Sequence, residues 1–188
     1  GLALRLHEIS DRVFCLPYAA RLWWPPKTKV KPKGSPYRTK PELGLDLITL
    51  THSWLRDDEH LRLVTDLGYC CETVLKGRPK GVHVTGRLLK TAALYGLVEP
   101  QVVRRRGRPR KKGDRLPTPK AMFADPSLNW IEIEVFCYGK KITLHVHQFT
   151  ALWYHSAGEE AVSVVLCRDP RVRHSDAVFF ATDLTPSA

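Results

Sequence analysis

The sequence predicts an α/β fold, with a mixed sheet and flanking helices in the first part of the chain and a β-rich part after it. Over residues 1–90 the hydrophobic patterns follow the order strand, strand, helix, strand, helix, strand. The character changes near residue 96, where a basic, proline-rich stretch begins, and most later residues fall in β-like runs. We therefore expect an α/β part over 1–96, a basic linker over 97–120 and a β-rich part from residue 121 onward.

The first expected elements are two strands and a helix. Leucines alternate with small or polar residues over 2–6, which is the pattern of a half-buried strand. A second extended run covers 12–24, and Pro17 within it indicates an edge position or a bend. Residues 39–42 form a capping box with a proline in the first turn, so a helix should begin there and end near Arg56.

The next elements surround an aspartate. A short buried strand at 60–65 leads directly to Asp66, and a helix at 69–76 is stopped by Gly77. A further strand is expected at 81–86. Beyond residue 120, with a hairpin turn at 138–140, the β-like runs are 129–138, 140–149, 151–155, 161–169 and 177–183.

Positive charge is concentrated in two segments. The chain of 188 residues carries a formal net charge of +11. Residues 27–40 contain six basic side chains and no acid, and residues 104–112 contain seven and no acid, so the rest of the chain is close to neutral. Such focused charge is expected for contact with a polyanion. The basic residues of the second segment are Arg104, Arg105, Arg106, Arg108, Arg110, Lys111 and Lys112.

The centre of this basic run favours DNA over other polyanions. Its residues 106–109 read Arg-Gly-Arg-Pro, which resembles an AT-hook, a slim extended strip that inserts arginines into A·T-rich minor grooves. The alternative is a solvated linker that touches phosphates without sequence preference. A non-enzymatic AT-hook-type DNA-binding protein is therefore one hypothesis for the whole chain.

Several classes of protein are disfavoured. The five cysteines are odd in number and contain no CxxC pair, which indicates a reduced, cytoplasmic protein. No apolar run approaches the length of a membrane span, and no signal peptide, Walker motif or GxGxxG motif is present. The chain starts inside an apparent strand and ends just after another, so we expect it to be a fragment.

Segments in order along nearly the whole chain resemble the DDE transposases of bacterial insertion sequences. The segments that carry the resemblance are VFCLPYAARLW (13–23), TKPEL (39–43), LVTDLGYC (63–70), HVTGRLLKTAALYGL (83–97), GRPRKKGDRLPTP (107–119), ALWYH (151–155), VVLCRDP (164–170) and FFATDLTPSA (179–188). The resemblance implies an RNase H-like core, incomplete in this chain, in which three acidic residues hold two Mg²⁺ or Mn²⁺ ions. It also implies that the β-rich part over 121–170 is an insertion into this core, and that the chain returns to the core over 171–188. It also implies a bacterial, cytoplasmic enzyme that acts on double-stranded DNA, with a homodimer as an option for the full-length protein.

The resemblance assigns only one catalytic carboxylate to this chain. Asp66 corresponds to the second aspartate, which would ligate metal. The first aspartate would precede Gly1 and the glutamate would follow Ala188, while the acidic residues that do not fit these places are Asp11, Glu159 and Glu160. We therefore expect the parent enzyme to cut at element ends and join the freed 3′-hydroxyl to target DNA. The chain alone should bind DNA weakly and catalyse nothing; an RNase H-like nuclease of another kind is a third reading.

A few other residues have both a functional and a structural interpretation. Arg87, at the end of a strand after Asp66, either approaches the scissile phosphate or is an ordinary surface arginine. His145 and His147, with Cys137, either form a zinc site or are half-buried strand residues. Cys70 and Cys71 either include a low-pKa thiol or pack in the core. Trp153 and Tyr154 either stack on a base or are buried aromatic residues.

Overall fold

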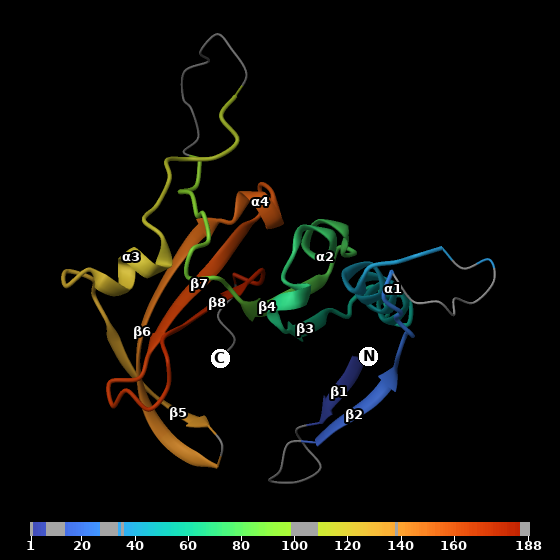
Figure 1. Cartoon of the computed structure of the whole chain (residues 1–188), viewed down its shortest axis with the longest axis horizontal. Coiled ribbons are helices and arrows are strands. Elements are labelled where there is room, and N and C mark those ends of the chain that lie inside the picture. The colour runs from blue at the N-terminus through green and yellow to red at the C-terminus, as the bar shows by residue number, and fades with distance from the viewer. Residues whose placement is uncertain are drawn as a thin grey trace.

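The structure is a computed structural model that describes residues 2–6, 14–26, 34, 36–98, 109–137 and 139–184. These residues form a mixed α/β fold with two sheets (Figure 1). A two-stranded antiparallel sheet pairs β1 (Leu2–Leu6) with β2 (Phe14–Ala19). The second sheet has six strands in the order β3-β4-β8-β7-β6-β5. Their bounds are Leu61–Thr65 (β3), Val82–Arg87 (β4), Ile131–Cys137 (β5), Lys140–Leu152 (β6), Ala161–Arg168 (β7) and Ala177–Ala181 (β8).

The larger sheet is mixed because one of its strand pairs is parallel. β3 and β4 run parallel, and all the other neighbours are antiparallel. The expected order of elements over 1–90 is confirmed, and the fold class agrees with an RNase H-like core. The sequence patterns did not indicate that β1 and β2 would pair only with each other among the described residues, separate from β3.

Helix α1 (Lys40–His52) forms for the reason that the sequence indicates. Thr39 is its N-cap: the Thr39 hydroxyl accepts from the Glu42 N–H, and the Glu42 carboxylate accepts from the Thr39 N–H at 2.6 Å. The helix ends four residues before the expected Arg56. Ser53 donates its hydroxyl hydrogen bond to the carbonyl of Leu50 at 2.7 Å, a local contact that competes with continued helix.

The remaining helices are short. They are the 3₁₀ turn η1 (Leu67–Tyr69), α2 (Glu72–Gly77), α3 (Pro119–Ala124) and α4 (Tyr154–Ala157). The expected helix at 69–76 is thus divided into η1 and α2, and α3 was not expected. The β-like run at 151–155 is also divided: its first two residues end β6, and α4 then packs against α2. None of the helices in the described ranges is long and apolar enough to span a membrane.

The core lies on the middle strands of the six-stranded sheet. Its fully buried side chains come from β4, β7 and β8, joined by residues of α2 and of the segment after β4, and include Val74, Leu75, Val84, Leu94, Val162, Val164, Leu166, Val178 and Phe180. The expected insertion therefore does not form a separate sheet, since β5, β6 and β7 continue the sheet of β3 and β4 through β8. The segment boundaries at 96, 120 and 170 remain predictions.

Candidate functional site

Asp66 stands directly after β3, at the carboxyl end of the parallel strand pair. Its side chain is the N-cap of η1, and its Oδ1 accepts a hydrogen bond from the Gly68 N–H at 3.0 Å. The residue is exposed, and no other hydrogen bond to its carboxylate is found among the described residues. Asp66 therefore combines a role in the turn with a carboxylate oxygen that is open to a ligand.

The backbone behind Asp66 is held by Cys70. The Cys70 thiol donates to the Asp66 carbonyl at 3.1 Å and lies 3.2 Å from the Thr65 hydroxyl. Cys70 is buried, and this burial raises the pKa of its thiol. The structural reading of Cys70 as a core residue is therefore confirmed, because a reactive low-pKa thiol needs the opposite shift.

Gly86 on β4 allows this close packing. A Cβ at this position would overlap the Cys70 sulfur and would lie 2.9 Å from the Thr65 hydroxyl oxygen. Any residue larger than glycine would therefore push the turn that carries Asp66 away from β4.

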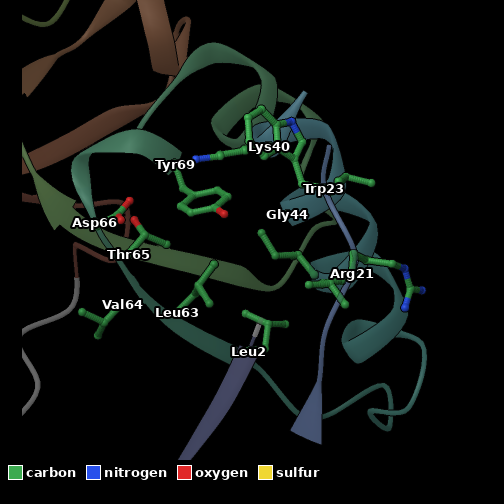
Figure 2. Close-up of a pocket in the computed structure, with 13 residues that line it drawn as sticks. Leu2, Arg21, Trp23, Lys40, Gly44, Leu63, Val64, Thr65, Asp66 and Tyr69 are labelled. Carbon is green, nitrogen blue, oxygen red and sulfur yellow. The ribbon is translucent and has the colours of Figure 1, made fainter. Parts of the chain in front are cut away.

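A pocket opens beside Asp66 between α1, β1 and β3 (Figure 2). Its volume is about 250 Å³. Leu2 and Leu63 line its floor from the two separate sheets, and β3 pairs with β4 on one side only within the described residues. Val64 on β3 is 80% exposed. The pocket thus borders an open strand edge that ends in Asp66.

Two further residues of this pocket, Lys40 and Tyr69, were not singled out by sequence reasoning. Lys40, at the start of α1, places its ammonium group 4.4 Å from the centre of the Trp23 ring, and both residues line the pocket. The Tyr69 ring lies against α1 where Gly44 has no side chain (Figure 2). Lys40 belongs to the basic segment 27–40, so charge indicated the segment but not this position.

Arg87 lies on the same side of the sheet as Asp66. Thr65 is paired with Gly86, so the next residues, Asp66 and Arg87, leave β3 and β4 at the same level. The Arg87 guanidinium is 6.0 Å from the centre of the Phe179 ring. The structure therefore brings these two predicted site residues together at the carboxyl ends of β3 and β4.

Residues 110–112, the basic residues of the run that the structure describes, lie away from Asp66. Arg110 pairs with Asp114 at 2.9 Å and Lys111 pairs with Glu159. The Lys112 ammonium lies 3.9 Å from the centre of the Tyr95 ring and 5.2 Å from that of Tyr154. Tyr95 bridges to Leu152 at the carboxyl end of β6, which runs antiparallel to β3. These three basic residues therefore lie toward the opposite end of the strands from Asp66. Arg104, Arg105, Arg106 and Arg108 are outside the described residues.

The two strand histidines and Trp153 have neighbours within the protein. His147 Nδ1 lies 2.8 Å from the carbonyl oxygen of Asn129, and His145 lies 3.6 Å from Glu132. Trp153 is buried and packs edge-on against Phe180, so it is not available to stack on a base. Cys71 is partly buried and Tyr154 borders the hollow around Lys112. The side chain of Cys137 is outside the described residues.

A metal centre is only partly supplied by the described residues. Asp66 offers the hard oxygen ligand that Mg²⁺ prefers. Within the described part of the chain, however, no group of three or more His, Cys, Asp or Glu residues could hold a metal ion. Further carboxylates are required before this edge can bind metal ions in the manner of a two-metal site.

The mixed α/β sheet, with an exposed carboxylate at the carboxyl end of a parallel strand, is consistent with an RNase H-like core. The family model described as DDE superfamily endonuclease matches residues 3–154, and the chain belongs to this family. Members of the family act on DNA and generally use divalent metal ions. Comparison with curated proteins and with solved structures gave no match.

Proposed function

We propose that the chain is part of the catalytic domain of an insertion-sequence transposase, which cuts and joins DNA strands at element ends. The observation that carries this proposal is the position of Asp66. It is an exposed carboxylate beside an open strand edge, in a chain that belongs to the DDE endonuclease family.

The open edge of β3 explains how a second carboxylate would join Asp66. An edge strand with free backbone groups can pair with a further strand. The carboxyl ends of parallel neighbours meet at the same edge of a sheet, so a strand that paired in parallel with β3 and ended in aspartate would place its carboxylate beside Asp66. The apolar floor of the pocket, with Leu2 and Leu63, suits the side chains of such a strand.

The roles of this chain's residues follow from that arrangement. Asp66 would ligate Mg²⁺ or Mn²⁺, and the bound ions would supply the activation of the attacking oxygen and the charge compensation at phosphorus. Arg87 offers a fixed positive charge to the phosphate at the same edge. The arginines of the basic run would hold the duplex through its phosphates or minor groove, while the contacts of residues 110–112 with the protein anchor that run to the sheet.

A first experiment tests whether the basic run over 104–112 binds DNA. The purified chain should bind duplex DNA, and replacement of Arg106 and Arg108 by alanine should make the log–log salt dependence of binding less steep by about 0.9 for each phosphate that these side chains neutralise. Unchanged affinity and unchanged salt dependence in the double variant would show that the basic run does not bind the DNA.

A second experiment tests the claim that this chain lacks part of its catalytic centre. With Mg²⁺ or Mn²⁺, the chain of residues 1–188 should not nick supercoiled DNA, because Asp66 alone cannot hold the ions. If the chain nicks DNA and Asp66→Ala abolishes the nicking, the claim of inactivity is wrong. A footprint restricted to element ends would separate a transposase from an RNase H-like nuclease of another kind.

A further inference from the structure

The loop between β7 and β8 (residues 169–176) has an unusual tip. Val172 adopts a left-handed backbone conformation, with φ of 54°, although its side chain is β-branched. This conformation is strained for valine and persists only where the surroundings impose it. The Val172 side chain is also 86% exposed, so the strain serves no packing within the chain.

Asp169 imposes the shape of this loop. Its side chain is fully buried and accepts hydrogen bonds from the Arg171 N–H at 2.9 Å and from Arg173 Nε at 3.2 Å. The Val172 N–H donates to the Asp169 carbonyl at 2.9 Å. Burial by itself raises the pKa of Asp169, but the hydrogen bonds from Arg171 and Arg173 outweigh it and hold the pKa below its usual value. The loop is therefore a fixed turn rather than a loose connection.

The tip presents an apolar side chain between two positive ones. Arg171 and Arg173 flank Val172 directly. Arg173 shares its charge with Asp169, whereas no ion pair to Arg171 is found within the described ranges. Pro170 to Ser175 are all exposed, so the tip is available to a partner.

The loop leaves the sheet on the side of Asp66 and Arg87. β7 runs parallel to β3 and β4, because β4 and β7 are both antiparallel to β8, so the carboxyl ends of these three strands point the same way. Val165 of β7 and Phe179 of β8 are paired at the level of Arg87, and β7 ends three residues later at Arg168. At about 3.3 Å a residue along the strand, the loop begins roughly 10 Å beyond that level. β7 is three strand positions from β3, which is roughly 14 Å across the sheet, so one duplex is wide enough to contact both the loop and Asp66.

We propose that this loop is a second DNA contact, in which Arg171 and Arg173 hold phosphates and Val172 presses against the base pairs between them. Proteins that bind the minor groove commonly combine arginines with apolar side chains that insert between base steps and unstack them. A single exposed valine is too small for a stable protein interface or for membrane insertion. The proposal rests on the proposed action on DNA and adds a site that would distort the duplex next to Asp66.

The experiment uses the chain of residues 1–188 and a short duplex that carries 2-aminopurine at its pyrimidine–purine steps, which unstack most easily. Arg171→Ala should make the salt dependence of binding less steep by about 0.9. Val172→Asn should leave the salt dependence unchanged, because asparagine tolerates the left-handed conformation, but it should abolish the rise in 2-aminopurine fluorescence on binding.

Arg56→Ala is the matched control, because it removes the same charge from an exposed arginine before β3, at the other end of that strand. It should leave both measurements unchanged. Equal behaviour of Arg171→Ala and Arg56→Ala, or undiminished fluorescence in Val172→Asn, would overturn the loop proposal alone. If the unsubstituted chain does not bind the duplex at any salt concentration, the loop proposal and the proposed DNA binding by the basic run both fail.

Discussion

Gly86 determines how closely the turn after β3 approaches β4. The absent side chain leaves room for the Cys70 sulfur, which in turn holds the Asp66 carbonyl. The orientation of Asp66 therefore depends on a residue that is distant in the sequence and adjacent in the sheet. Neither Gly86 nor Cys70 lines the pocket in which the carboxylate is available, so both act by positioning.

Replacing Gly86 by alanine should destabilise the protein by about 1–3 kcal/mol, the usual cost of forcing an extra methyl group into a packed site. Chemical denaturation would measure the change in the free energy of unfolding. Removing the sulfur with Cys70→Ala creates space, so the double variant should lose less than the sum of the two single variants. Strict additivity in this cycle would contradict the overlap with Cys70.

Single residues differ in how far the sequence reveals them. The place of Asp66 at the end of a strand could be predicted because the strand before it has a recognisable buried pattern, while its role as a metal ligand stays a prediction. Lys40 and Tyr69 could not be placed beside it, because their neighbourhood arises from the packing of α1 against η1. The strained tip at Val172 has no sequence signal, since valine is rarely found in that conformation.

Among the elements, α1 has the most explicit start signal. Hydrogen bonds from the Thr39 N–H and from the Thr39 hydroxyl lower the pKa of Glu42. A carboxyl whose pKa is lower in the folded state stabilises the fold above its unfolded pKa, and this contribution is lost as the pH falls through the lowered value. The capping box should therefore contribute fully at neutral pH and fade in acid.

Thr39→Ala should cost about 1 kcal/mol at neutral pH, because it removes the cap hydroxyl. Thr39→Ser, which keeps the hydroxyl, is the control and should change little. Glu42→Gln should lower stability at neutral pH and reduce the loss of stability on acidification. Urea denaturation at several pH values would test this. If the free energy of unfolding falls by the same amount on acidification in Glu42→Gln as in the unsubstituted chain, the assigned role of Glu42 is wrong.

The order of elements could be predicted over 1–90, and their ends could not. Capping residues marked the start of α1, but side-chain hydrogen bonds to the last carbonyls ended it early. The run at 151–155 reads as a strand from its aromatic and apolar residues, yet packing against α2 turns its second half into α4. Local patterns specify the type of an element better than its boundaries because tertiary contacts decide the latter.

For the whole molecule, the pairing of strands separates the two basic features of the chain. Arg87 and the β7–β8 loop lie toward the carboxyl ends of β3, β4 and β7, on the side of Asp66. The described end of the basic run lies toward the carboxyl end of β6, on the other side (Figure 1). The antiparallel course of β6 thus carries residues 110–112 away from Asp66.

The central claim is that Asp66 is a metal-binding carboxylate of a DNA-cleaving centre, and one measurement tests it most directly. A protein that carries this chain together with the proposed further carboxylates would be assayed for cleavage of DNA carrying the element ends, with Mg²⁺ or Mn²⁺, beside its Asp66→Asn variant. Asparagine can still cap Gly68, so the variant should keep its stability, while cleavage should fall by at least about 100-fold because a metal ligand is lost. Cleavage by Asp66→Asn at the unsubstituted rate would contradict the account.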